Sequence, residues 1–167
     1  LFVKKSAVPT ANAPRYVGAS VIFADVDPNT GLMGPDHLTQ AMERAAGKAK
    51  AIFPVHLAGQ CADMASISEI ARKHNLAIIE DASHALGANY RNGNTDCLIG
   101  SCTDSDMTVF SFHPVKSIAM GEGGAITTND GPLAERLKRL RSHGMERSAP
   151  AFKNDDLAFT ENVGVNP

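Results

Sequence analysis

The chain has 167 residues, of which 43% are hydrophobic and 20% are charged. This length and composition are typical of one globular domain and argue against a disordered chain. Sixteen Lys and Arg against eighteen Asp and Glu give a formal net charge of −2, which predicts no nucleic-acid partner. No apolar run reaches the roughly 20 residues of a membrane-spanning helix. Three cysteines are too few for a disulfide scaffold and favour a reducing, cytoplasmic setting.

Short apolar runs rich in β-branched residues alternate with amphipathic segments along the chain. Pro35 suits the first turn of one amphipathic segment, and Asp63 is predicted to cap the next one. Residues 89–106 and the chain from Ser142 onward are predicted to be irregular. In chain order, the predicted elements are a strand at 21–24, a helix at 35–47, a strand at 51–55, a helix at 64–74, strands at 76–79, 107–112 and 125–128, and a helix at 133–141.

The alternation of strands and helices predicts an α/β fold. Consecutive strands joined by helices form parallel sheets, and such sheets carry helices on both faces. We therefore expect three layers, α/β/α, around a mostly parallel sheet. Ligands bind such sheets beyond the carboxyl ends of the strands, so the polar residues at those ends are the candidates for a functional site.

Five polar residues map to this edge of the predicted sheet. Asp81 and His84 follow the strand at 76–79, Ser111 and His113 end the strand at 107–112, and Lys116 lies just beyond it. A lysine at such a place can form a Schiff base with an aldehyde cofactor. Pyridoxal phosphate also needs an acid at its ring nitrogen, and a hydroxyl group can bind its phosphate. The set therefore indicates a pyridoxal-phosphate site.

Five segments of the chain resemble one known family. The chain is similar to the DegT/StrS (DegT/DnrJ/EryC type) pyridoxal-phosphate sugar aminotransferases. The five segments occur in the order found in that family and with compatible spacing. The matching segments are Pro-Val-His-Leu-Ala-Gly at 54–59 with Asp-Met at 63–64, Asp-Ala-Ser-His-Ala-Leu-Gly at 81–87, Ser-Phe-His-Pro-Val-Lys at 111–116, Gly-Glu-Gly-Gly-Ala at 121–125 and Arg-Ser-His-Gly-Met at 141–145.

The resemblance implies a role for each candidate residue. Lys116 would hold the cofactor as a Schiff base and, once freed, would move the proton during transamination. Asp81 would pair with the pyridine nitrogen, His84 would bond the phenolic oxygen, and Ser111 would contact the phosphate. The implied fold is the large domain of fold type I, which resembles aspartate aminotransferase.

The resemblance also implies substrates and partners. The acceptor would be a nucleotide-linked keto sugar, the donor would be an amino acid such as glutamate, and the full-length protein would be a homodimer. His84 together with the segment 113–116 looks closest to the branch that acts on UDP-linked 4-keto-6-deoxy-N-acetylhexosamines, to which enzymes of the pseudaminic-acid route belong. Neither a nucleic acid nor a membrane is expected as a partner.

The chain also departs from the family pattern. Family members are much longer, so residues 1–147 are expected to be part of the large domain, truncated at both ends. Residues 148–167 are expected to be a polar loop leading to a missing C-terminal domain. Pro9 and Pro14 interrupt the early helix of the family, and part of the phosphate-binding loop is absent. We therefore expect this chain alone to bind the cofactor weakly or not at all.

Other interpretations remain open. The chain could be a non-catalytic or regulatory relative or an inactive fragment. It could also be a sugar dehydratase of the same family, although such members replace the lysine that Lys116 retains. The set Cys61, Cys97, Cys102 and His113 fits no common structural zinc spacing, so free thiols and no metal are predicted. His56, which also follows a strand, is left out of the predicted site because a purely structural histidine is at least as good an interpretation.

Overall fold

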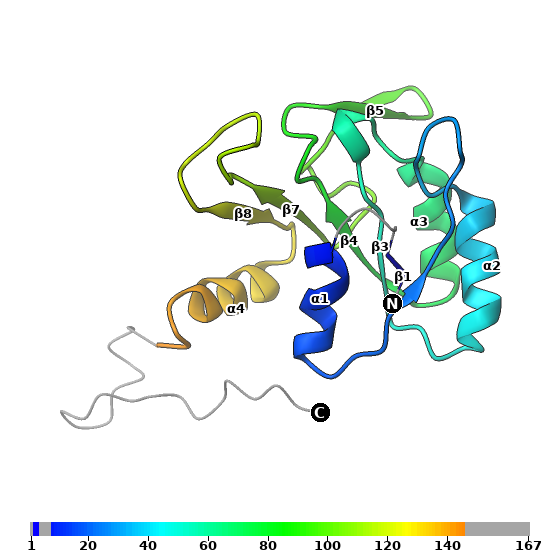
Figure 1. Cartoon of the computed structure of the whole chain (residues 1–167), viewed down its shortest axis with the longest axis horizontal. Helices are drawn as coiled ribbons and strands as arrows, with labels where there is room; N and C mark the ends of the chain where they lie inside the picture. The colour runs from blue at the N-terminus through cyan, green and yellow to red at the C-terminus, as the bar shows by residue number, and fades with distance from the viewer. Residues whose placement is uncertain (1, 4–7, 146–167) are drawn as a thin grey trace. The chain divides into compact units, whose positions relative to one another are not determined.

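A six-stranded sheet organises the computed structural model, which describes residues 2–3 and 8–145 (Figure 1). The first five strands along the sheet are parallel and the last runs antiparallel to its neighbour. This confirms the predicted mixed α/β fold with a mostly parallel sheet. The strands, in their order across the sheet, are β2 (Ile22–Phe23), β1 (Phe2–Val3), β3 (Ala51–Phe53), β4 (Ala77–Asp81), β7 (Met107–Ser111) and β8 (Gly124–Thr127).

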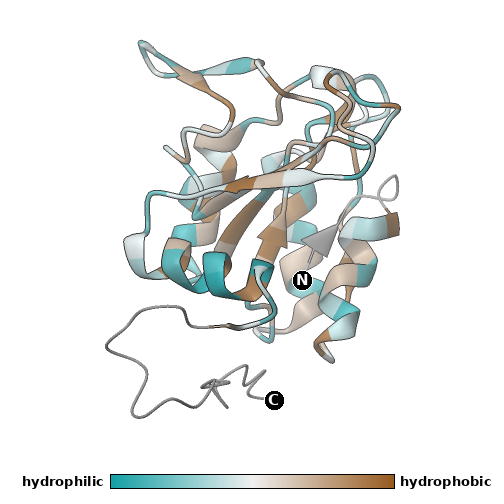
Figure 2. Ribbon diagram, turned by 90° about the vertical axis from the view of Figure 1, so that its left-hand side faces the viewer, coloured by the Kyte–Doolittle hydropathy of each residue, from teal (hydrophilic) through white to brown (hydrophobic). Residues whose placement is uncertain are grey.

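The helices that connect the parallel strands lie on two faces of the sheet (Figures 1 and 2). Helix α1 (Val8–Tyr16) connects β1 to β2, toward one edge. Helices α2 (Pro35–Ala45) and α3 (Met64–Lys73) connect β2 to β3 and β3 to β4, toward the other edge. Such crossovers are right-handed, so two crossovers that run toward opposite edges of the sheet lie on opposite faces. Helix α1 therefore covers one face, and α2 and α3 cover the other. This arrangement makes the three predicted layers.

The main hydrophobic core lies between the sheet and the pair α2 and α3. Both helices present an apolar stripe at helical spacing, and the facing strands supply β-branched residues, which colour brown in Figure 2. Burying such side chains removes apolar area from water, the main stabilising term of a fold. Seven side chains of this core have no exposed area, namely Leu38, Ala41, Ile52, Met64, Ile67, Ala71 and Ile78.

The predicted helices begin and end close to their expected residues. The Asp63 side chain accepts a hydrogen bond from the Ser66 N–H at 3.2 Å, so it caps α3 as predicted. Helix α2 ends at Ala45 rather than at residue 47 because Ala46 takes a left-handed conformation. Helix α4 (Gly131–Arg141) begins two residues early, where Asp130 caps it through the Leu133 N–H. It belongs to a second unit that begins at Asp130.

The prediction of a loop at residues 89–106 was wrong in its first half. Strands β5 (Asn89–Asn92) and β6 (Thr95–Leu98) form an antiparallel hairpin there. The two residues between them include Gly93 with φ +58°, and positive φ is what a tight hairpin turn requires. Asp104 holds the hairpin, because it accepts hydrogen bonds from the Tyr90 hydroxyl at 2.7 Å and from the Asn92 amide.

Helix α1 also differs from the expectation, since its prolines do not prevent a helix. Pro9 lies in the first turn, where a backbone N–H has no partner within the helix. Pro14 lies in the last turn and is buried, and the helix ends two residues later at Tyr16. The missing bond therefore falls where the helix is ending anyway. No helix among the described residues is long and apolar enough to cross a membrane, and the predicted polar loop at 148–167 lies outside those residues.

Gly124 allows β7 and β8 to approach closely, and its replacement tests the packing. A Cβ atom there would lie 2.7 Å from the Phe110 carbonyl oxygen, which the backbone of the paired strand cannot avoid without moving. We expect Gly124→Ala to lower the free energy of unfolding by about 1–3 kcal/mol in denaturant titrations. Gly131→Ala is the control, because nothing lies within 4 Å of its added Cβ. Equal stability of the two variants would contradict the close approach.

Candidate active site

A cavity of about 140 Å³ opens at the carboxyl ends of the parallel strands. The connections after β1 and β3 leave toward opposite faces of the sheet, and the crevice between such neighbours is the usual ligand site of this architecture. Residues from α1, from the loop after β3, from the end of β4 and from the loop after β7 line the cavity. They are Pro9, Thr10, Val55, His56, Leu57, Asp81, Ser83, His84 and Lys116.

Asp81 is the last residue of β4, and its carboxylate is held through both oxygens. The Thr10 hydroxyl donates to Oδ2, and the Ser83 N–H donates to Oδ1 at 3.1 Å. The side chain is 8% exposed, so its orientation is fixed beside the cavity. The second contact closes a short turn after the strand. Thr10 was missed from the sequence because the helix that carries it was not predicted.

Lys116 lines the same cavity from the loop after β7. Its backbone N–H donates to the His113 carbonyl at 2.9 Å and closes a turn. This turn places the lysine at the cavity. The side chain is half-buried, and no described residue accepts a hydrogen bond from its amine. An amine at such a cavity is the kind of group that can form a Schiff base with an aldehyde.

His84 also lines the cavity, although its side chain is exposed. Its Nδ1 accepts a long hydrogen bond, 3.4 Å, from the N–H of Ala58. This contact leaves the ring proton on Nε2, which can donate to an anionic oxygen of a ligand. Asp81, His84 and Lys116 are therefore brought together as the sequence predicts.

Ser111 ends β7 at the same edge of the sheet but does not line the cavity. Its Oγ accepts a hydrogen bond from the His113 N–H at 3.4 Å, a local turn that side-chain hydroxyls often form. The His113 ring is exposed, and its Nδ1 accepts from the Val115 N–H. A role of Ser111 in binding a phosphate group stays a prediction.

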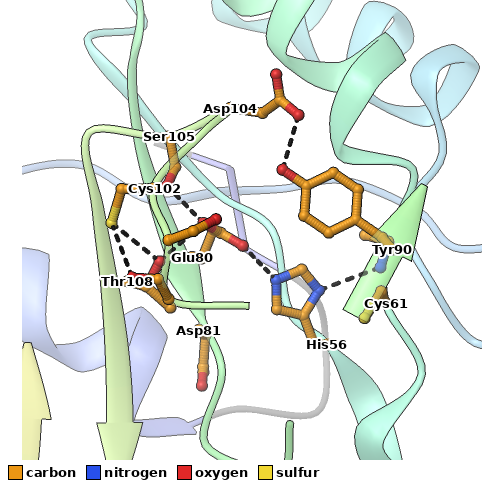
Figure 3. A network of polar contacts seen from close by, with 12 residues as sticks. His56, Cys61, Glu80, Asp81, Tyr90, Cys102, Asp104, Ser105 and Thr108 are labelled. Atoms are coloured by element: carbon orange, nitrogen blue, oxygen red, sulfur yellow. Dashed lines mark hydrogen bonds and ion pairs between the residues drawn. The ribbon is translucent and has the colours of Figure 1, made fainter. Parts of the chain in front are cut away.

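A buried polar network lies behind the cavity (Figure 3). His56 Nε2 lies 2.7 Å from Glu80 Oε2, and the hydroxyls of Ser105 and Thr108 donate to Glu80 Oε1. Burial by itself would raise the pKa of Glu80, but these hydrogen bonds outweigh burial and hold the pKa below its usual value. Glu80 therefore stays ionised. His56 is among the lining residues of the cavity, and both of its ring nitrogens have hydrogen-bond partners within the chain, as the interpretation of a structural histidine expects.

Neither the second cavity nor the cysteines contribute to the lining of this cavity. A larger cavity of about 380 Å³ lies between α2 and α3, at the amino ends of the strands, and its lining is mainly apolar. Burial, with the charge of Glu80, raises the pKa of the Cys61 thiol. Cys102 Sγ lies 3.3 Å from the Thr127 carbonyl. Within residues 2–3 and 8–145, no group of three or more His, Cys, Asp or Glu could hold a metal ion.

Comparison with known proteins decides the family. The model of the DegT/DnrJ/EryC1/StrS aminotransferase family matches residues 3–166. The chain belongs to this family. It is 41% identical to the spore coat polysaccharide biosynthesis protein SpsC of Bacillus subtilis and covers 34% of that protein with 84% of itself. It is 43% identical to the GDP-perosamine synthase of Caulobacter vibrioides, covering 35% of it with 83% of itself.

Solved structures of the family share the fold. An aminotransferase from Psychrobacter cryohalolentis superposes with a TM-score of 0.77 at 31% identity over 90% of this chain and 38% of that one. PseC of Helicobacter pylori gives a TM-score of 0.75 at 33% identity over 88% of this chain and 37% of that one. The chain therefore has the fold of a DegT-family large domain. It spans about a third of the length of the curated relatives it matches.

The ionised Glu80 predicts a specific pH dependence of stability. Its folded pKa is depressed, so its contribution is present above the unfolded pKa of about 4.3 and is lost as the pH falls through the folded pKa. We expect Glu80→Gln to destabilise the chain by roughly 3 kcal/mol at pH 7, measured by denaturant unfolding. The difference in the free energy of unfolding between Glu80→Gln and the parent chain should narrow as the pH falls below about 4.3.

Glu69→Gln provides the control for this experiment. Glu69 forms an exposed ion pair with Lys73, and exposed pairs contribute little to stability. Its replacement should change the unfolding profile only slightly across the same pH range. A gap between Glu80→Gln and the parent that stays constant down to low pH would show that Glu80 is not ionised in the folded state.

Proposed function

We propose that this chain supplies the cofactor-holding part of a pyridoxal-phosphate-dependent aminotransferase acting on a nucleotide-linked sugar. The observation that carries the proposal is the meeting of Asp81, His84 and Lys116, from the ends of different strands, around one cavity. Membership of an aminotransferase family supports it. So does the structure of NtdA from Bacillus subtilis, a neighbour with a TM-score of 0.74 that is described with bound cofactor PMP.

The residues of the cavity fit this cofactor. The buried Asp81 carboxylate, held by Thr10 and Ser83, suits a protonated ring nitrogen, because an ionised acceptor favours the charged ring. The amine of Lys116 would hold the cofactor aldehyde and, when free, would move the proton of the substrate carbon. His84 Nε2–H would donate to the phenolic oxygen, and Ser111 would bind the phosphate. When bound, the cofactor supplies an electron sink that stabilises a carbanion.

The names of the relatives support a substrate class. Proteins named GDP-perosamine synthase and dTDP-3-amino-3,4,6-trideoxy-alpha-D-glucose transaminase are each 43% identical to the chain. A Campylobacter jejuni protein named UDP-4-amino-4,6-dideoxy-N-acetyl-beta-L-altrosamine transaminase is 40% identical. These names support an acceptor that is a nucleotide-linked sugar. We propose the UDP-linked 4-keto-6-deoxy-N-acetylhexosamine branch, on His84 and residues 113–116, with glutamate as donor.

The surroundings of the cavity favour a second copy of the protein as partner. Three large apolar side chains of the loop that carries Lys116 are more than half exposed, namely Val115, Ile118 and Met120. Exposed apolar clusters of this kind mark interfaces. A homodimer, with residues 1–147 as part of the large domain and 148–167 leading to a C-terminal domain, would cover them. We place the enzyme in the cytoplasm because its substrates are products of sugar-nucleotide metabolism.

A non-catalytic relative is the alternative. One relative, 39% identical, carries the name Pleiotropic regulatory protein. A regulatory role needs no reactive amine, whereas Lys116 lines the same cavity as a buried carboxylate. The same lysine disfavours a sugar dehydratase, in which a histidine replaces it. We therefore favour the transaminase, and the following experiment separates these outcomes.

Covalent trapping tests the proposed role of Lys116. The chain is treated with excess pyridoxal phosphate and then borohydride, and the modified lysines are mapped by mass spectrometry. Reduction captures even weak adducts, so we expect Lys116 to be modified at least about tenfold faster than an unperturbed surface lysine, since a tenfold rate difference needs only about 1.4 kcal/mol of selective binding. Lys48 and Lys50 are the internal controls, because both are exposed.

Two variants make the trapping experiment decisive. Lys116→Ala should abolish the fast modification and leave the slow labelling of Lys48 and Lys50 unchanged. Asp81→Asn should slow the labelling of Lys116, because the neutral amide no longer favours a protonated ring. Equal labelling of Lys116 and the surface lysines would contradict the aminotransferase site in this chain and favour the non-catalytic alternative.

A further inference from the structure

The proposed reaction makes no use of the most deeply buried charged residue of the chain. Glu80 is 2% exposed, and its partner His56 is 0% exposed. Moving a carboxylate out of water costs several kcal/mol, which its partners rarely repay in net stability. A buried pair of this kind is therefore better explained by the geometry that it fixes than by the stability that it adds. The question is which geometry it fixes.

The hydrogen bonds define the proton positions of the network. The Ala62 N–H donates to His56 Nδ1 at 3.1 Å, so this nitrogen carries no proton. His56 Nε2 therefore carries the ring proton and donates it to Glu80 at 2.7 Å. Glu80 accepts two further hydrogen bonds from hydroxyls. The ring is neutral, the carboxylate is charged, and each has its hydrogen bonds satisfied, which is the condition for a well-defined buried polar network.

The network joins the two strands whose ends flank the cavity. His56 follows β3, and Glu80 is the penultimate residue of β4. Successive residues of a strand point to opposite faces, and Figure 3 shows Asp81 pointing away from the network that Glu80 joins. Glu80 thus contacts His56 behind the sheet, while the next residue of the same strand presents its carboxylate at the cavity.

The backbone of Asp81 depends on the same pair of strands. The His56 N–H donates to the Asp81 carbonyl at 3.0 Å, and the Asp81 N–H donates to the Pro54 carbonyl at 2.8 Å. The regular pairing of β3 with β4 involves only Ala51 and Ile52. Beyond it the strands are joined by an isolated bridge between Val55 and Asp81. The side-chain bond across the same two strands reinforces the point where the ladder is weakest.

We propose that His56 and Glu80 form a positioning clamp that fixes the Asp81 carboxylate at the cavity. The hydrogen bond between His56 and Glu80 lies within the chain and is not a contact to the ligand. Their bond sets the separation and register of the ends of β3 and β4, and this register determines the position of Asp81. The identity of the ligand that Asp81 meets rests on the proposed function, but the clamp itself is a property of the cofactor-free chain.

Two substitutions of His56 separate its two hydrogen bonds. The amide nitrogen of Gln can reach the place of Nε2, so His56→Gln keeps a donor for Glu80 and loses the acceptor for Ala62. The amide oxygen of Asn can reach the place of Nδ1, so His56→Asn keeps that acceptor and loses the bond to Glu80. If the clamp positions Asp81, Gln preserves the position and Asn does not.

Amide hydrogen exchange in the cofactor-free chain measures the clamp directly. Hydrogen bonds to charged groups are strong enough to change a local opening equilibrium at least tenfold. We expect the backbone amides of residues 56 and 81 to exchange at least about tenfold faster in His56→Asn than in the parent chain. In His56→Gln their exchange rates should stay within about threefold of the parent values. The dissociation constant for pyridoxal phosphate, followed by absorbance, should rise about tenfold in His56→Asn only.

Tyr90→Phe is the matched control. It removes the hydrogen bond from Tyr90 to Asp104, a half-buried polar contact that does not join β3 to β4. It should leave the exchange of the Asp81 amide and the dissociation constant within about threefold of the parent values. A loss of protection in Tyr90→Phe as large as in His56→Asn would mean that the network acts only through general stability and would overturn the proposal.

The remaining outcomes also decide. Equal exchange of the Asp81 amide in His56→Asn and His56→Gln would overturn the clamp. If His56→Asn does not fold, Glu80→Gln removes the charge that strengthens the bond to His56, and unchanged exchange at Asp81 in that variant would overturn it too. Should the parent chain show no binding of pyridoxal phosphate, the proposed function fails, while the exchange data still confirm or reject the clamp.

Discussion

The site depends on one constraint, the right-handedness of the connections between parallel strands. Because α1 and α2 connect strands in opposite directions across the sheet, they lie on opposite faces, and a crevice opens where the connections diverge. The ends of β3 and β4 flank this crevice. Four separate segments of chain can therefore contribute to a single small cavity.

The chemistry of the site divides between the two faces of β4. On one side, Asp81 meets the hydroxyl of Thr10 at the start of α1. On the other, Glu80 is enclosed by His56 and two hydroxyls. Adjacent residues of one strand thus separate a carboxylate at the cavity from one in the buried network. A ligand that needs a fixed carboxylate meets one whose backbone and side chain are both held, and such preorganisation reduces the cost of binding.

Elements with strong periodicity could be predicted from the sequence, and weaker ones could not. The apolar stripe of α3 and its Asp63 cap define that helix without reference to the rest of the chain. The hairpin of β5 and β6 has mostly polar residues, so only its turn at Gly93 gave a signal. The converging residues of the site were predictable because parallel strands bring their ends together. Thr10 was not, because it lies on a helix that carries two prolines. The contact of Ser111 with the His113 N–H depends on a local turn, and its role in binding a phosphate group stays a prediction.

Strand β1 carries a consequence for how the sheet can assemble. It lies between β2 and β3, and β2 is joined to the sheet through β1 alone among the described strands. Strands β1 and β2 are consecutive and can pair with each other, but this pair reaches the rest of the sheet only when β1 pairs with β3, which places Phe2 beside Ile52. Contacts of this non-local kind slow folding. The core of α2, α3, β3 and β4, built from consecutive segments, is the part that can form first and offer β1 a template.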